Sequence, residues 1–402
     1  MLEICTTALR LAVRCLMLVY AVRHCSPDVL LSMIELETHR PRIVRGTLAL
    51  IGLALLAACS SVPRQPPEPA AVDVRADIER RIPASVADRR GWAGDIQAAF
   101  AAQAITPNPE NICAVLAVIE QESGYQADPV VANLPQIARR EIDRRAAALH
   151  IPKLLVDAGL KVKAADGRSY AEHLARVRTE RELSVLYEDI IGRVPLGSRL
   201  FAGKNPVQTG GAMQVGIPFA ESHARGYPWP VSDSVRNEVF SRRGGLYFGI
   251  QHLLGYQTPY TQKVHRFADY NAGRYASRNA AFQNAVGIAS GSTLALDGDL
   301  LNPGASLDQP GQTERAVRRL MPELGMDERA IRRALEQGDQ LQFSDSALHA
   351  KVFALAEARA GKTLPRALIP GIRLDSPKII RELTTEWFAT RVDARYRQCL
   401  QR

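Results

Sequence analysis

The chain has 402 residues, and its 51 Lys and Arg against 42 Asp and Glu give a formal net charge of +9. This length allows two or more domains, and the basic balance suits a protein that works on an anionic polymer. Nucleic acid is one such polymer. The sequence holds no basic motif interleaved with aromatic residues, however, so we expect no nucleic-acid partner.

The N-terminal region predicts a secretory signal. Residues 46–58 are apolar, follow three arginines between positions 40 and 45, and end next to Cys59. A basic stretch, a short apolar run and small residues before a cleavage point make up such a signal, and this run is too short to span a bilayer. Leu-Ala-Ala-Cys at 56–59 looks like a lipobox, in which Cys59 becomes the lipidated first residue. A buried helix that happens to end in cysteine is the alternative.

The signal sets the expected N-terminal boundaries. We assign residues 33–58 to the signal peptide, since Met33 lies a normal distance before Cys59, and residues 1–32 to an extension upstream of the true start. Residues 59–73, with four prolines, read as a stiff tether. Ser60 stands where inner-membrane lipoproteins typically carry aspartate, which favours the outer membrane, with the chain facing the periplasm. The lipid would hold it there by burying acyl CH₂ groups, at about 0.8 kcal/mol each.

Cysteine usage agrees with export. Three of the six cysteines precede the expected start and Cys59 is the lipid acceptor, so Cys113 and Cys399 remain. In an oxidising periplasm these two could form one disulfide. The sequence does not show that they lie close together, so the pairing stays open.

A helix is predicted to end in a carboxylate. Asn108 is a suitable N-cap with Pro109 at the first helical position, and Gly124 is a suitable stop. At about 100° per residue, Glu122 continues the apolar side of this helix, whereas Glu120 points about 200° away from it. The buried stripe therefore ends in Glu122.

The rest of the chain also reads as helical, and no run of alternating strand residues is convincing. Residues 130–205 are predicted to form a charged helical insertion. Three roles stay open for it: a lid, a wall of the cleft, or a peripheral addition without a role in the site. Further helices are expected near residue 218, at 245–254 and, after a loop at 287–310, at about 312–322, 327–337 and 344–360, with a last helix that starts at Ser376 and Pro377.

Three short motifs carry a resemblance. Glu122-Ser123-Gly124, Gly-Ala-Met-Gln-Val at 211–215 and Tyr-Asn-Ala-Gly at 270–273 occur in this order. Together they resemble the goose-type lysozyme and soluble lytic transglycosylase family, enzymes that cut the glycan strands of bacterial peptidoglycan. The resemblance implies an all-α, lysozyme-like domain over 74–290, interrupted by the insertion, and leaves 291–402 as a helical C-terminal extension.

This sequence also departs from the family pattern. Ala212 replaces the usual leucine of the second motif, and His252 stands where the family often has tyrosine. The segment between the first two motifs is far longer than in the family. These departures suggest a divergent branch of lipoproteins.

The resemblance implies a reaction carried by one glutamate. Cleavage of a glycosidic bond needs a protonated carboxylic acid, and an apolar setting keeps a carboxyl protonated by raising its pKa. In the family the glutamate, here Glu122, acts first as acid and then as base. It takes the proton of the sugar's own 6-hydroxyl, which closes a 1,6-anhydro ring on N-acetylmuramic acid without consuming water.

The resemblance also implies a set of substrate-binding residues around Glu122. Ser123 would fix the glutamate, Gly211 would let backbone approach the ligand, and Met213 would pack under the sugar. Gln214 would face the cleft, Tyr270 would hydrogen-bond the carboxyl or the substrate, and Asn271 would fix the local turn or contact substrate. Each also has an ordinary reading, as a helix cap, core packing, a solvated turn or a buried tyrosine.

Two other functions remain open at this point. One is a muramidase that uses water and a second carboxylate, for which Asp128 and Asp269 are the nearest candidates. The other is a non-catalytic cell-wall-binding lipoprotein that kept the fold. No metal-binding or phosphate-binding motif is present, so we expect neither metal nor cofactor. The expected partners are peptidoglycan strands and, through Cys59, the membrane; protein partners stay unknown.

Overall fold

The computed structural model describes residues 73–193, 199, 201–231, 233–374 and 382–402. The expected signal peptide, Cys59 and nearly all of the tether lie outside these residues, as does the expected start of the last helix at Ser376. Within the described part, no helix combines the length and the apolar character needed to cross a membrane.

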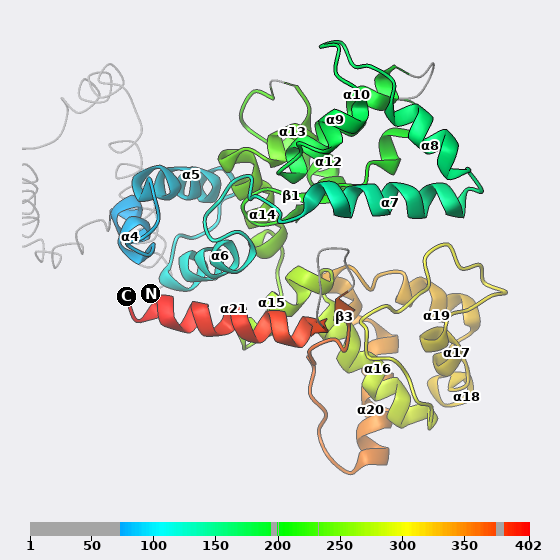
Figure 1. Cartoon of the computed structure of the whole chain (residues 1–402). Coiled ribbons are helices and arrows are strands. Elements are labelled where there is room, and N and C mark those ends of the chain that lie inside the picture. The colour runs from blue at the N-terminus through cyan, green and yellow to red at the C-terminus, as the bar shows by residue number, and fades with distance from the viewer. Residues whose placement is uncertain (1–72, 194–198, 200, 232, 375–381) are drawn as a thin grey trace, which may run out of the picture. The chain divides into compact units, whose positions relative to one another are not determined.

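Helices make up most of the described chain (Figure 1). The α-helices are, in chain order, α4 (Val74–Arg81), α5 (Arg89–Ala102), α6 (Pro109–Glu122), α7 (Leu134–Ala148), α8 (Lys153–Leu160), α9 (Tyr170–Leu174), α10 (Glu180–Gly192), α12 (Ile217–Ser222), α13 (Val235–Val239), α14 (Arg242–Leu254), α15 (Lys263–Ala272), α16 (Ala276–Ser290), α17 (Gln312–Arg318), α18 (Met321–Leu324), α19 (Glu328–Leu335), α20 (Ala347–Ala360) and α21 (Thr385–Leu400). The mainly-α class predicted from the sequence is confirmed.

Two short antiparallel pairs of strands interrupt the helices. β1 (Thr209–Gly210) pairs with β2 (Val215–Gly216), with Thr209 opposite Gly216. β3 (Arg373–Leu374) pairs with β4 (Leu383–Thr384). Because each strand has only two residues, the sequence offers no alternating pattern from which to predict them. The turn between the strands of the first pair carries the second motif.

The first hydrophobic core is built around α6. Every residue of this helix from Ile112 to Ile119 is buried, among residues of α5, α14 and α15. The C-terminal helix α21 belongs to the same core through Phe388, Val392 and Tyr396, and Figure 1 shows it beside α6 and α15.

Two further cores complete the described part. One gathers residues of α16, α17, α19 and α20, and the other lies inside the insertion, among α7, α9 and α10. The boundary between these cores therefore does not lie at residue 290, where the sequence predicts the end of the lysozyme-like domain. α16, on the N-terminal side of that boundary, contributes Phe282 and Val286 to the second core, whereas α21, far beyond the boundary, returns to the first.

Candidate functional site

The first motif lies at the end of α6. Asn108 caps this helix by accepting the backbone N–H of Asn111, and Pro109 opens it, as predicted. The apolar side then delivers Glu122, half-buried, to the C-terminal end, and Gly124 follows with a positive φ of 58°. Glu120 faces another way and pairs with Arg395 at 3.4 Å.

The second motif forms the turn between β1 and β2. Gly211 has a φ of 75°, and a Cβ there would lie 2.2 Å from the carbonyl oxygen of Val239, so only glycine fits. Ala212 and Met213 are fully buried. Gln214, with a φ of 50°, stays partly exposed, and its amide oxygen accepts the hydroxyl of Thr209 at 3.2 Å.

Hydrogen bonds bring the three motifs together at this turn. The Ser123 hydroxyl lies 2.8 Å from the carbonyl oxygen of Ala212. The Tyr270 hydroxyl donates to the next carbonyl, that of Met213, at 2.7 Å. Side chains from the first and third motifs thus hold two consecutive peptide groups of the second.

Tyr270 lies in the electrostatic field of Glu122. Burial raises the pKa of the Tyr270 phenol well above its usual value, and the negative charge of Glu122 raises it further. The phenol is therefore neutral at any physiological pH, and the two side chains are near neighbours. Since its proton is given to Met213, the phenol oxygen keeps its lone pairs as acceptors.

Two glycines let α14 approach this turn. A Cβ on Gly245 would lie 2.7 Å from the Val239 carbonyl oxygen and 3.1 Å from the backbone nitrogen of Ala212. A Cβ on Gly249 would lie 2.6 Å from the side chain of Met213. α14 and the turn between β1 and β2 therefore pack closely against each other, which fixes the position of the second motif.

His252 packs against Tyr270. The centroids of the two rings lie 4.9 Å apart, and His252 Nε2 lies 3.2 Å from the Tyr270 carbonyl oxygen. Because a carbonyl only accepts, Nε2 must carry the proton. Burial lowers the pKa of His252 to about 4, so the ring is neutral at neutral pH. The sequence marked this position only as a departure from the family, and its contact with Tyr270 was not predicted.

The two candidates for a second carboxylate sit in different settings. Asp269 is fully buried, and its oxygens accept the Tyr260 hydroxyl at 2.7 Å and the backbone N–H groups of Tyr275 and Ser277. These donors make it a structural centre of the α15–α16 connection. Asp128 lies instead against the insertion, where burial raises its pKa and Thr179 hydrogen-bonds it.

Asn271 has a structural contact. Its side-chain oxygen accepts the hydroxyl of Thr385 at 2.8 Å, at the start of α21, while the residue as a whole stays exposed. This links the third motif to the C-terminal helix.

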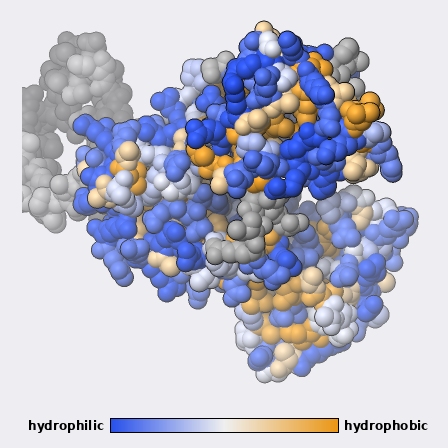
Figure 2. All heavy atoms as spheres, viewed as in Figure 1, coloured by the Kyte–Doolittle hydropathy of each residue, from blue (hydrophilic) through white to orange (hydrophobic). Residues whose placement is uncertain are grey.

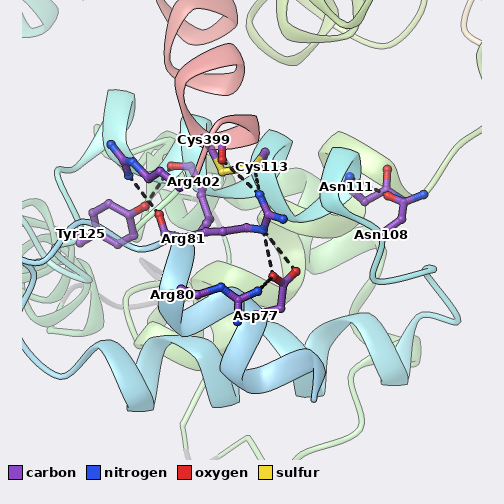
Figure 3. Close-up of a disulfide and its surroundings, with 10 residues drawn as sticks. Asp77, Arg80, Arg81, Asn108, Asn111, Cys113, Tyr125, Cys399 and Arg402 are labelled. Atoms are coloured by element: carbon purple, nitrogen blue, oxygen red, sulfur yellow. Dashed lines mark hydrogen bonds and ion pairs between the residues drawn. A yellow bond between two sulfur atoms is a disulfide. The ribbon is translucent and has the colours of Figure 1, made fainter. Parts of the chain in front are cut away.

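A disulfide joins Cys113 and Cys399, with their Cα atoms 5.5 Å apart. It connects α6, the helix that carries Glu122, to the end of α21, and Figure 3 shows the bond between the two helices. Arg81 from α4 donates to the carbonyl oxygen of Cys399 at 3.1 Å. The pairing that the sequence left open is thus present, and it ties the site helix to the last turn of the chain.

Two cavities lie on the insertion side of the motifs. One, of about 670 Å³, is lined by Asp128 and by polar residues of α9 and α10. The other, of about 510 Å³, is mostly apolar and lies among α7, α9 and α10. Its wall includes Thr209, the residue whose hydroxyl holds Gln214, so the insertion borders the second motif directly. Among the described residues, no group of three or more His, Cys, Asp or Glu is arranged to hold a metal ion.

Comparison with known proteins gives a family and a relative. Residues 85–402 match the family model described as "Protein of unknown function (DUF1615)". The chain is 53% identical, over 358 residues, to a protein of Escherichia coli (strain K12) with the printed name "Uncharacterized protein YaiW", and the match covers 89% of this chain and 98% of that protein. No solved structure matches the chain.

Proposed function

We propose that this chain, which belongs to the DUF1615 family, is a peptidoglycan lytic transglycosylase with a lysozyme-like fold. The proposal rests on the chain's own candidate site. It would cut the β-1,4 bond between N-acetylmuramic acid and N-acetylglucosamine. The observation that carries the proposal is the convergence of the three motifs. Ser123 and Tyr270 hold adjacent carbonyls of one turn, and the charge of Glu122 acts on Tyr270.

Glu122 would act first as the acid. It ends the apolar side of α6 and is half-buried, and the proposal needs this setting to favour the neutral carboxylic acid. Tyr270 suits this role, because its phenol donates its proton to Met213 and keeps only lone pairs for a neighbouring donor. A protonated carboxyl can donate to such an oxygen, whereas a carboxylate cannot. The acid proton then goes to the leaving glycosidic oxygen.

The same group would then act as the base. After giving up its proton, Glu122 is a carboxylate and can remove the proton of the 6-hydroxyl of the muramic acid residue. The 6-oxygen attacks the anomeric carbon as the glycosidic bond breaks, which closes the 1,6-anhydro ring. Glu122 ends the cycle protonated, so atoms and charge balance with no water consumed.

Hydrolysis is less well supported by this arrangement. Asp269 is committed to tyrosine and backbone donors and fully buried. Asp128 lines a cavity of the insertion with residues of α9 and α10. A non-catalytic wall-binding role would need neither a carboxylate at the end of the apolar helix side nor a neutral phenol beside it.

The setting that we propose is the bacterial cell envelope. The predicted signal and lipobox would leave the protein anchored through Cys59, with the catalytic part in the periplasm beside its substrate. The disulfide between Cys113 and Cys399 suits that oxidising compartment.

Product analysis tests the proposal. Purified sacculi are digested with the chain from Ser60 onward, and the released muropeptides are identified by mass spectrometry. Products that end in 1,6-anhydro-N-acetylmuramic acid support the proposal, and reducing ends would support the hydrolase instead. Sacculi that bind the protein but release nothing would support the non-catalytic role.

A further inference from the structure

The insertion exposes apolar side chains that the proposed function does not use. Among the residues that the structure describes, eight of the ten large hydrophobic residues that are exposed lie between Val130 and Phe201. Five of these eight fall within residues 149–162, on α8 and the residues directly before and after it. They are Leu149 at 71%, Ile151 at 42%, Leu154 at 78%, Leu155 at 61% and Val162 at 54% exposure. We refer to residues 149–163 as the insertion tip.

The insertion tip is also basic. Lys153, Lys161 and Lys163 are all exposed. The one acidic residue in the tip, Asp157, is paired with Arg139 of α7. The charge left facing solvent is therefore positive. Figure 2 shows hydrophobic residues gathered over α8, with hydrophilic ones beside them.

This combination fits a lipid surface. Isolated apolar side chains at a protein surface are normal, but a cluster rimmed by polar residues marks an interaction site. Leucines flanked by lysines are the pattern of segments that enter the boundary between headgroups and acyl chains, with the cations on anionic headgroups.

The shape of the cluster argues against a groove in another protein. A helix that docks in a groove presents apolar residues at i, i+3, i+4 and i+7. Here Leu154 and Leu155 are adjacent in the first turn of an eight-residue helix, and Leu149 and Ile151 precede that helix. The exposed residues thus form a tip and not a stripe, which suits shallow insertion into a fluid interface.

We propose that the insertion tip docks on a bilayer surface that carries anionic headgroups. Leu154, Leu155 and their apolar neighbours enter the interface, and the three lysines contact the headgroups. This contact would be separate from the expected lipid on Cys59 and from glycan cleavage. The proposal stands or falls independently of the transglycosylase reaction, because its test measures no cleavage.

The test is vesicle co-sedimentation with the chain from Ser60 onward, which contains the whole compact unit Val72–Arg402 and lacks the lipidated cysteine. We expect binding to vesicles of phosphatidylcholine with 30% phosphatidylglycerol, and at least tenfold weaker binding to phosphatidylcholine alone. Leu154→Asn with Leu155→Asn should weaken binding at least tenfold, and so should Lys153→Glu with Lys161→Glu.

Matched variants separate the tip from general surface effects. Val231→Asn with Leu400→Asn removes two exposed apolar residues outside the tip. Arg329→Glu with Lys362→Glu makes the same charge change at exposed positions of the C-terminal part. Both controls should bind like the parent, with circular dichroism showing that all variants are folded.

Two results would overturn the proposal. The first is no binding to the anionic vesicles. If the parent is then dimeric by light scattering and becomes monomeric when Leu154 and Leu155 are replaced, the tip contacts a second copy of the chain instead. The second is binding that both tip variants leave unchanged.

Discussion

At the scale of single residues, the site depends on how Tyr270 is held. Its hydroxyl donates to Met213, its carbonyl accepts from His252, and its ring packs against that imidazole. The phenol therefore has one orientation beside Glu122. Sequence pattern can select Glu122 from helical phase and Tyr270 from its motif. It cannot give these hydrogen bonds, because they join residues 18 and 57 positions apart.

Replacing Tyr270 with phenylalanine should cost both stability and activity. The buried carbonyl of Met213 would lose its donor, which costs about 1–3 kcal/mol. The neutral phenol proposed to lie beside the Glu122 carboxyl would also be lost. Urea denaturation measures the first effect and muropeptide release the second. Tyr187→Phe is the control, because its hydroxyl bonds a carbonyl at an exposed position; equal losses in both variants would contradict the account.

His252 should make stability depend on pH. Its pKa is about 4 in the folded chain and about 6.5 when unfolded. Between these values the unfolded chain binds more protons, so the free energy of unfolding falls as pH drops from about 6.5 to about 4, by about 3 kcal/mol at most. His349, with a folded pKa of about 4 as well, adds a similar loss.

Variants assign this pH dependence. His252→Asn should reduce the slope of unfolding free energy against pH in that window by no more than about half, because His349 and His265, whose pKa burial also lowers, still contribute. His150→Asn, at an exposed position, should leave the slope unchanged. Urea denaturation at a series of pH values gives the slope, and an unchanged slope in the His252 variant would contradict the buried setting described for this ring.

At the scale of elements, the site rests on α6, on α14 and on the turn between β1 and β2. The sequence predicts α6 with its cap and stop, because Asn108, Pro109 and Gly124 are local signals. It does not predict the two-residue strands, nor the packing of α14 on the turn. Those features depend on which backbones approach each other in space.

Gly211 tests that packing. In Gly211→Ala the new Cβ meets the Val239 carbonyl oxygen, and the positive φ is strained for alanine. We expect a loss of more than about 1 kcal/mol in unfolding free energy and a displaced turn, with a matching fall in glycan cleavage. Gly94→Ala, in the helix α5 with nothing within 4 Å of its Cβ, is the control and should be neutral or stabilising. Equal stability of the two variants would contradict the packing described here.

The disulfide should stabilise the whole first core. It closes a loop between residues 286 positions apart and holds α21 against α6. Replacing both Cys113 and Cys399 with alanine should lower stability by about 2–5 kcal/mol. Differential scanning calorimetry with and without reductant measures this change. In the double variant the reductant should have no effect, and a parent that is insensitive to reductant would contradict the role of the bond.

At the scale of the whole molecule, the described part of one chain builds three cores. The chain leaves the first core after α15 and returns to it with α21. The sequence predicts a helix near the C-terminus, but not that its Phe388 and Val392 lie against α6 and α15. Sequence pattern alone therefore groups residues 291–402 as one extension. The length and charge of residues 130–205 predict the insertion, whereas its own small core and its cavity beside Thr209 appear only in three dimensions.

The most direct test of the central claim compares two glutamates on one helix. Glu122→Gln and Glu120→Gln remove a carboxylate two residues apart, and Glu120 is in a partly exposed ion pair with Arg395 that contributes little stability. Release of 1,6-anhydro muropeptides from sacculi is measured for both variants and the parent. We expect Glu122→Gln to lose about 10²-fold or more of the rate and Glu120→Gln to keep it. Full activity in Glu122→Gln would contradict the account.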